Sequence, residues 1–314
     1  MKSASQGSLF QTPARDTSLR VGPAGWNYKD WEGIVYPSGA GKSFDALTYL
    51  AEFFDTVEIN SSFYAPPRSR DATAWARRVR NNPRFRFTAK AWQKLSHDRE
   101  EATEASIAAD CEVVRRSLAP LAEAGILGAL LVQFPWSFRH TEENLAYLES
   151  LFRRLAGYRL ALEVRHGSWD RQEFYAFLRE SDVAFCNVDQ PVIGDSMEPS
   201  GRVTSRLGYL RLHGRNYRTW FEKDAGRDER YDYLYTKAEI KEVSGRLRIM
   251  KQEADETYAI TNNHFRGQAL VNAIEILEEL DAQPPAVPSL LARAYPRLAE
   301  VGRGGPTRPP AAGN

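Results

Sequence analysis

RLALEVRH, residues 159–166, shows the pattern that decides the fold of this chain. The apolar Leu162 and Val164 alternate with the charged Glu163 and Arg165, as in a strand whose two faces meet different surroundings. Seven more short runs rich in strand-forming residues recur at fairly even intervals. They are residues 19–25, 56–60, 85–90, 129–134, 183–189, 209–214 and 257–264.

Stretches with helical period separate most of these runs, at 43–54, 71–81, 104–125, 141–157, 171–181, 236–254 and 266–280. Thr236 and Glu239 form a capping box, and Gly125 and Gly157 stand at helix C-terminal stops. An open doubly wound sheet is the alternative, but no glycine-rich phosphate-binding turn follows the first run. We therefore predict an α/β fold, a single-domain (β/α)8 TIM barrel over residues 19–301 with loop insertions at its C-terminal face.

The link between the sixth and seventh runs departs from this pattern. Residues 190–208, QPVIGDSMEPSGRVTSRLG, are rich in Gly, Pro and Ser and show no helical period. A structureless link of this length is uncommon in a compact domain, so it marks either a functional loop or a flaw in the assignment. Residues 1–18 and 302–314 are predicted to be disordered tails, and the first of them has no signal-peptide core.

Composition disfavours several classes of protein. The 314 residues include 42 Lys and Arg against 41 Asp and Glu, and a net charge of +1 argues against a broad nucleic-acid-binding surface. Hydrophobic residues make up 42% of the chain, enough for a packed core. Two cysteines, Cys111 and Cys186, exclude a disulfide framework and a cysteine-based zinc site. Because no membrane-spanning apolar stretch occurs, we expect a soluble, cytoplasmic protein without a membrane partner.

Alternation along the strands turns polar side chains toward the barrel axis. In FRFTAK (85–90) the phenylalanines face the helices, so Arg86 and Lys90 face inward. The other inward polar residues are Glu58, Asn60, Gln133, Glu163, Arg165, Asn187, Asp189, Tyr209, Arg211, His213, Asn262 and Asn263. Phe185 shares the parity of Asn187 and Asp189, which weakens that assignment. Such polarity inside a barrel is costly unless the groups are paired.

Two interpretations of this inward set stay open. In the first, its carboxylates and cations neutralise each other as a structural network. In the second, a surplus of cations attracts a small ligand that bears phosphate or carboxylate. The carboxylates are Glu58, Glu163 and Asp189, and the cations are Arg86, Lys90, Arg165 and Arg211. Four cations against three carboxylates favour an anion-binding pocket.

Aromatic and histidine side chains concentrate after the predicted strand ends, at the face where barrel enzymes carry their active sites. Trp26, Tyr28 and Tyr64 are candidate ligand contacts among them. Residues 27–37, 63–70 and 215–235 mix basic residues with aromatic rings, which suits binding of nucleic acid or a flipped nucleotide. The same composition suits a lid over a small-molecule pocket, and the balanced net charge favours the lid.

Eight stretches resemble the signature blocks of the domain-of-unknown-function 72 family, also called the YecE-like family. They are GWNYKDWEGIVYP (25–37), FDTVEINSSFYAPP (54–67), FRFTAKAWQKLSHD (85–98), LGALLVQFPWSF (127–138), LALEVRHGSW (160–169), YLRLHGRNY (209–217), YDYLY (231–235) and TNNHFRGQALVNA (261–273). The resemblance spans residues 19–283 and implies a TIM-type barrel, but it supplies no activity. PAGW (23–26) stands where TSGW is commoner, and QFPWSF (133–138) where QLPPSF is usual, which bears on the pocket wall.

Several kinds of chemistry fit the inward residues. A carboxylate beside an arginine stays ionised and suits a general base, so Glu58 and Glu163 are candidate bases and His213 a candidate acid. Lys90 with a depressed pKa is a weaker candidate for a Schiff base. A metal site built from Glu163, Asp189 and His213 would resemble those of barrel endonucleases. Because neighbouring arginines would crowd the cation, we predict no cofactor and keep a divalent metal as an alternative.

We therefore predict an enzyme that acts by acid/base chemistry on a small anionic ligand, bearing phosphate or carboxylate, at the C-terminal barrel mouth. The catalytic candidates are Glu58, Glu163 and His213, and the ligand-binding candidates are Trp26, Tyr28, Asn60, Tyr64, Arg86, Lys90, Gln133, Arg165, Arg211, Asn262 and Asn263. The alternatives are a nucleic-acid or nucleotide-binding protein, including a metal-assisted phosphodiesterase, and a non-catalytic small-molecule binder. No sequence feature indicates an oligomeric state.

Overall fold

Eight parallel strands form one sheet in the computed structural model, which describes residues 18–41, 43–99, 102–217, 231–280 and 287–301. The strands are β1 (Leu19–Pro23), β2 (Thr56–Ile59), β3 (Arg86–Lys90), β4 (Leu127–Gln133), β5 (Leu160–Glu163), β6 (Ala184–Asp189), β7 (Leu207–Leu212) and β8 (Glu256–Thr261). Each of the eight predicted runs overlaps one of these strands, with bounds shifted by up to three residues at either end.

The sheet closes into a barrel between its first two strands. Strands β1 and β8 pair in parallel, and the order then runs backward along the chain from β8 to β2. A bridge between Ala24 and Glu58 joins β1 to β2, and the Gly25 amide donates to the Glu58 carbonyl at 2.8 Å. A side chain at Gly22 would collide with the carbonyl oxygen of Thr56, so only glycine permits this close approach. The predicted TIM barrel is confirmed.

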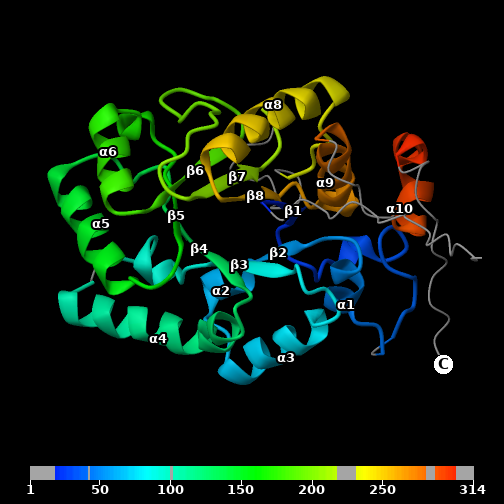
Figure 1. The fold of residues 1–314 in the computed structure, drawn as a ribbon, viewed down its shortest axis with the longest axis horizontal. Coiled ribbons are helices and arrows are strands. Elements are labelled where there is room, and N and C mark those ends of the chain that lie inside the picture. The colour runs from blue at the N-terminus through cyan, green and yellow to red at the C-terminus, as the bar shows by residue number, and fades with distance from the viewer. Residues whose placement is uncertain (1–17, 42, 100–101, 218–230, 281–286, 302–314) are drawn as a thin grey trace, which may run out of the picture.

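Helices surround the strands (Figure 1). They are α1 (Ala46–Ala51), α2 (Ser61–Tyr64), α3 (Ser69–Val79), α4 (Glu104–Glu123), α5 (Glu142–Arg154), α6 (Gln172–Glu180), α8 (Lys237–Glu253), α9 (Gln268–Glu279) and α10 (Ser289–Ala294). The capping box of Thr236 and Glu239 begins α8 as predicted, because each side chain accepts a hydrogen bond from the other residue's backbone amide. Gly125 and Gly157 follow α4 and α5 with positive φ, which confirms them as helix stops.

The link between β6 and β7 contains no helix in residues 190–206, as its composition predicts. Two buried side chains tie it to the barrel. Thr204 accepts from the Phe185 amide at 2.7 Å and donates to the Val183 carbonyl at 2.6 Å. Asn187 bonds the backbone of Arg202 through both ends of its amide, at 2.8 and 2.9 Å. The link therefore covers the barrel where a helix would otherwise lie.

The two faces of the strands pack into separate cores. An inner cluster fills the barrel axis and includes Leu131, Cys186 and Ile260, while a larger outer cluster lies between strands and helices. The predicted alternation is wrong for β6. Cys186 faces the axis, whereas Asn187 and Asp189 face outward. Phe185 decides this parity, because its ring packs edge-on against Tyr175 of α6, with ring centroids 5.3 Å apart.

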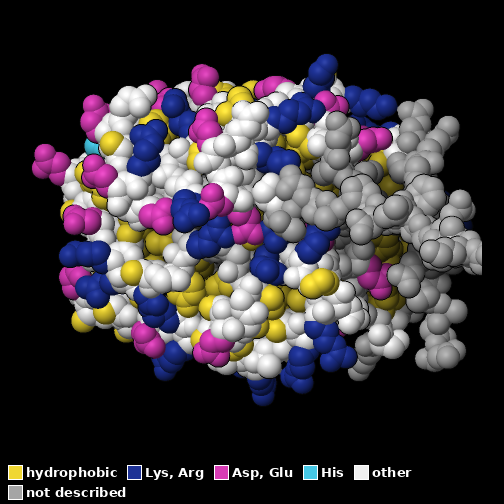
Figure 2. All heavy atoms as spheres, viewed as in Figure 1, with side chains coloured by type: hydrophobic (Ala, Val, Ile, Leu, Met, Phe, Trp, Pro, Cys, Tyr) yellow, Lys and Arg dark blue, Asp and Glu magenta, His cyan; other side chains and the backbone are white. Residues whose placement is uncertain are grey.

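The exposed face in Figure 2 carries acidic and basic side chains side by side, in keeping with the net charge of +1. Among the described residues, no helix combines the length and the apolar character that crossing a membrane requires. The predicted tails, apart from Ser18, lie outside the described residues.

Candidate functional site

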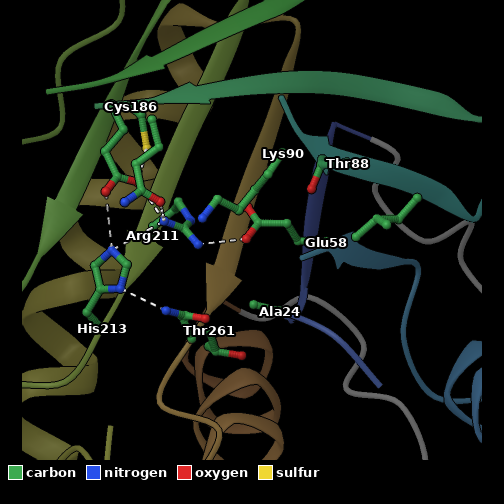
Figure 3. A network of polar contacts seen from close by, with 12 residues as sticks. Ala24, Glu58, Thr88, Lys90, Cys186, Arg211, His213 and Thr261 are labelled. Carbon is green, nitrogen blue, oxygen red and sulfur yellow. Dashed lines mark hydrogen bonds and ion pairs between the residues drawn. The ribbon is translucent and has the colours of Figure 1, made fainter. Parts of the chain in front are cut away.

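Arg211 of β7 lies at the centre of a buried ionic cluster inside the C-terminal end of the barrel (Figure 3). Its guanidinium donates to Glu58 of β2 at 2.7 Å and to Glu163 of β5 at 2.6 Å. The other oxygen of Glu58 accepts from the Tyr209 hydroxyl at 2.9 Å. Strand alternation places all four residues on the inward face, so one arginine joins strands from three parts of the chain.

Arg165 completes the partners of Glu163. Its Nε and Nη2 atoms donate to Glu163 Oε1 at 2.9 and 2.6 Å, and Nη2 lies 3.2 Å from His213 Nε2. Burial alone would raise the pKa of Glu163, but Arg211 and Arg165 hold it well below its ordinary value. Each oxygen of Glu58 and Glu163 therefore accepts at least one hydrogen bond within the cluster.

His213 is a neutral ring in this cluster. Burial, together with the adjacent Arg165, lowers the pKa of His213 to about 3. Both ring nitrogens face donor groups, since Nε2 lies 3.2 Å from Arg165 Nη2 and Nδ1 lies 2.9 Å from the side-chain nitrogen of Asn262. A ring with this pKa carries no proton to donate as an imidazolium at neutral pH, so the geometry does not favour the predicted acid role of His213.

Lys90, the last residue of β3, points toward Arg211 and Glu58 (Figure 3). Its amine has no ion pair or hydrogen bond with any described residue and lies 3.9 Å from the centre of the Phe63 ring. Burial, with Arg211 nearby, lowers the pKa of Lys90 to about 7. The cluster therefore holds three basic side chains against two carboxylates, and the surplus base is Lys90.

A cleft of about 220 Å³ opens beside the cluster. Its walls follow the C-terminal ends of β3 to β6, as the fold predicts for a barrel site. The lining residues are His97, Gln133, Pro135, Trp136, Arg165, Gln190 and Ser196. Gln133 links cleft and cluster, because its side-chain oxygen accepts from Arg211 at 3.3 Å. His97 and Lys90 pack on the same Phe63 ring, and burial beside Lys90 lowers the pKa of His97 to about 4.

Several buried polar atoms at this end of the barrel lack a partner among the described residues, and they include the amide oxygens of the residues that directly follow β2 and β6. Gln190 is 4% exposed, and its buried Oε1 accepts no hydrogen bond. Asn60 directly follows β2, and its Oδ1 is also buried without a donor. Unsatisfied buried acceptors are rare in proteins and often mark a place where a ligand binds. Sequence reasoning missed Gln190, although its position directly after β6 is the signal that could have found it.

Other predicted residues lie outside this cluster. Arg86 is at the opposite, N-terminal end of β3 and donates to the carbonyls of Pro83 and Phe85 at 3.2 and 2.9 Å. Inward parity is thus not enough, since a residue must also lie near the carboxyl end of its strand. Asn263 faces α9, where it donates to Asn272 at 2.8 Å.

The predicted metal triad is not brought together. Asp189 points outward and binds Arg215 at 2.7 Å, Arg246, and the Tyr235 hydroxyl at 2.8 Å. Glu163 and His213 lie on the other side of the sheet. Within the described ranges, no group of three or more His, Cys, Asp or Glu side chains is placed to hold a metal ion.

Most described rings of the aromatic segments are packed rather than open. Tyr28 stacks on His264 with ring centroids 4.5 Å apart, and Trp26 packs edge-on against Trp75 at 5.4 Å. Tyr64 is 67% exposed and Trp136, beside the cleft, is 40% exposed. Residues 218–230, which include much of the segment predicted as a lid or a nucleic-acid contact, lie outside the described residues.

Comparisons with known proteins agree with this architecture. Residues 20–297 match the family model described as "Protein of unknown function DUF72". The chain is 30% identical to the UPF0759 protein YunF of Bacillus subtilis over 276 residues, which cover 84% of this chain and 95% of that protein.

Two crystal structures of similar proteins share the fold. A DUF72 family protein of Thermotoga maritima superposes with a TM-score of 0.73 at 34% identity, covering 84% of this chain and 99% of that one. A DUF72 family protein of Enterococcus faecalis gives a TM-score of 0.73 at 29% identity, covering 84% and 95%. By the extent of the family match and by these relatives, the chain belongs to the DUF72 family.

Proposed function

We propose that this protein is an enzyme that binds a small phosphate- or carboxylate-bearing molecule at the C-terminal barrel mouth and acts on it by acid/base chemistry. The observation that carries the proposal is the surplus base. Lys90 has no acidic partner among the described residues, yet it lies in a cluster with the buried Arg211 and the partly buried Arg165, beside a cleft. An anion in the cleft would supply the missing negative charge.

The proposed roles differ from those the sequence predicts. Glu58 and Glu163 position the two guanidiniums, because each of their oxygens already accepts a hydrogen bond. Arg165, whose side chain is 15% exposed and lines the cleft, contacts the anion. Lys90 exchanges the proton, since an amine with a pKa of about 7 is available in both protonation states at neutral pH.

Anion binding tests this function. We expect inorganic phosphate or pyruvate, but not chloride at equal ionic strength, to raise the unfolding temperature of the protein in a saturable way. An anion at about 100 times its Kd adds about 2.7 kcal/mol to the free energy of unfolding.

The Arg165→Gln variant should lose this stabilisation. The control Arg70→Gln should keep it, because Arg70 is 72% exposed on α3, outside the cleft. An equal response of Arg165→Gln and the unchanged protein, or no response to either anion, would contradict the proposal.

A further inference from the structure

We propose that the Lys90 amine is a nucleophile that forms an imine with the carbonyl carbon of a small oxo anion held in the cleft by Arg165. The ligand class is an oxo acid or an oxo phosphate, a molecule with one carbonyl group and one anionic group. This inference rests on the anion binding of the proposed function, names its substrate class, and gives the Lys90 amine a covalent role in place of proton exchange.

The surroundings of Lys90 favour a neutral amine. Burial removes water from the amine and Arg211 repels its charge, and together they outweigh the attraction of the Phe63 ring, whose centre lies 3.9 Å away. Within the described chain no carboxylate forms an ion pair with Lys90, because Glu58 and Glu163 are held by Arg211 and Arg165. A lysine that is desolvated beside other cations is the arrangement that activates an amine as a nucleophile. Its lone pair is free at neutral pH in a large fraction of molecules.

The cleft offers the groups that such a ligand requires. The Arg165 guanidinium faces it as the anion contact, and Gln133 joins the cleft to the Arg211 cluster. Gln190, in the cleft lining, and Asn60, which follows β2 outside that lining, each have a buried acceptor oxygen without a donor among the described residues. The hydroxyl of a carbinolamine is a donor of the kind these acceptors lack.

The reaction balances without a cofactor. The Lys90 nitrogen attacks the carbonyl carbon, a C–N bond forms, and one amine proton passes to the carbonyl oxygen. The carbinolamine then loses its hydroxyl group together with the second amine proton as water, and a C=N bond forms. Protonation of the imine nitrogen from solvent gives an iminium that withdraws electrons from the neighbouring carbon. The neighbouring carbon then loses a proton to solvent or its carboxylate as CO2, and the electron pair of the broken bond moves toward the iminium nitrogen to give an enamine. Protonation of the enamine carbon and hydrolysis of the iminium by water release the product and the Lys90 amine.

Lys94 is a matched internal control. It follows Lys90 by four residues, and its amine also lies over an aromatic ring, that of Trp92, at 4.6 Å. Lys94 is exposed, whereas Lys90 is partly buried within the cationic cluster. The chain has nine lysines in all, so each can be followed in its own peptide.

Reductive trapping tests the inference. The protein is incubated with glyoxylate and cyanoborohydride near neutral pH, and mass spectrometry of its peptides measures the adduct at each lysine. We expect Lys90 to be modified at least about tenfold faster than Lys94, because a far larger fraction of its amine is unprotonated. The Lys90 rate should level off above about pH 7, while the Lys94 rate keeps rising. A Lys90 rate equal to or below that of Lys94 overturns the inference.

Three further reactions test whether the anionic group guides the ligand, which anionic group is preferred, and whether Lys90 is the residue that reacts. Acetaldehyde, which has the carbonyl but no charge, should still favour Lys90 over Lys94, but by a smaller factor than glyoxylate does if the anion site guides the reaction. Dihydroxyacetone phosphate in place of glyoxylate distinguishes an oxo phosphate from an oxo acid. The Lys90→Arg variant, checked for unchanged circular dichroism, should lose the fast adduct while Lys94 still reacts. If glyoxylate raises the unfolding temperature but Lys90 does not react, the imine is wrong and anion binding stands; if neither occurs, both proposals fail.

Discussion

Two buried ionic clusters lie at the same end of the barrel, on opposite sides of its sheet. The inner cluster places one arginine, Arg211, between two carboxylates, Glu58 and Glu163. The outer cluster places one carboxylate, Asp189, between two arginines, Arg215 and Arg246. Both are built from strand ends, and both exclude water from their central residue.

The clusters differ in what surrounds the centre. In the outer cluster, Glu242 accepts from Arg215 at 3.0 Å, and Arg246 comes from α8, so the network fastens a helix and a loop to the barrel. In the inner cluster, Lys90 adds a base without a carboxylate, and a cleft lies alongside. The outer cluster shows that buried salt bridges alone do not identify a ligand-binding site, because such bridges can simply hold a helix and a loop against the barrel. The inner cluster carries the proposed function because it combines a surplus base with an open cleft beside it.

Removing the centre of the inner cluster should have the largest effect. We expect Arg211→Met to lower the free energy of unfolding by about 3–5 kcal/mol, because Glu58 and Glu163 both lose the guanidinium that neutralises them inside the barrel. Urea unfolding at neutral pH measures this. The control Arg206→Met, at a side chain that is 81% exposed, should stay within about 1 kcal/mol. If Arg211→Met lost no more free energy of unfolding than Arg206→Met, the inner cluster would not stabilise the fold.

Removing the centre of the outer cluster should cost less. We expect Asp189→Asn to lower the free energy of unfolding by about 2–3 kcal/mol, since its partner arginines are 18% and 12% exposed and can be hydrated. Arg215 and Arg246 hold the pKa of Asp189 below its ordinary value of 3.8, although burial opposes them. The folded state therefore binds fewer protons than the unfolded state, and this stability is present above that pH and lost as the pH falls below it.

Urea unfolding of Asp189→Asn and of the unchanged protein, at pH 7 and at about pH 3, measures the difference in their free energies of unfolding at each pH. The two proteins should converge in acid. A gap that stays constant with pH would show that Asp189 stabilises the fold by packing rather than by charge.

Replacing the surplus base should have the smallest effect on stability, and in the opposite direction. We expect Lys90→Met to raise the free energy of unfolding by about 1–2 kcal/mol below pH 7, where the folded protein must hold a charged amine beside Arg211. The folded pKa of about 7 lies below the ordinary value of 10.5, so the penalty shrinks as the pH rises between them. Unfolding at about pH 6 and pH 10 checks this. A destabilised Lys90→Met variant would show that Lys90 has a structural partner.

Much of the candidate site follows from strand periodicity. The inward positions of Glu58, Glu163, Arg165 and Arg211 come from alternation of apolar and charged residues within single strands. Arg86 also faces inward but lies at the opposite end of its strand from the barrel mouth. Alternation along a strand predicts which face a residue occupies, but not how far along the barrel axis it lies. Strand β6 is buried on both faces, so its pattern is nearly continuous and its parity was decided by the packing of Phe185 on Tyr175.

The sequence by itself determined the number and order of the strands, the absence of a helix between β6 and β7, and the group of charges turned toward the axis. These three features depend on the periodicity of apolar residues within single segments and on which segments follow one another in the chain. Only the tertiary structure decided which charges meet. Glu58 and Arg211 are 153 residues apart, and no local pattern says that they pair and leave Lys90 without a carboxylate among the described residues. The pKa of the Lys90 amine depends on its burial and on its closeness to Arg211 of β7. Both exist only once the barrel has brought strands from distant parts of the chain together.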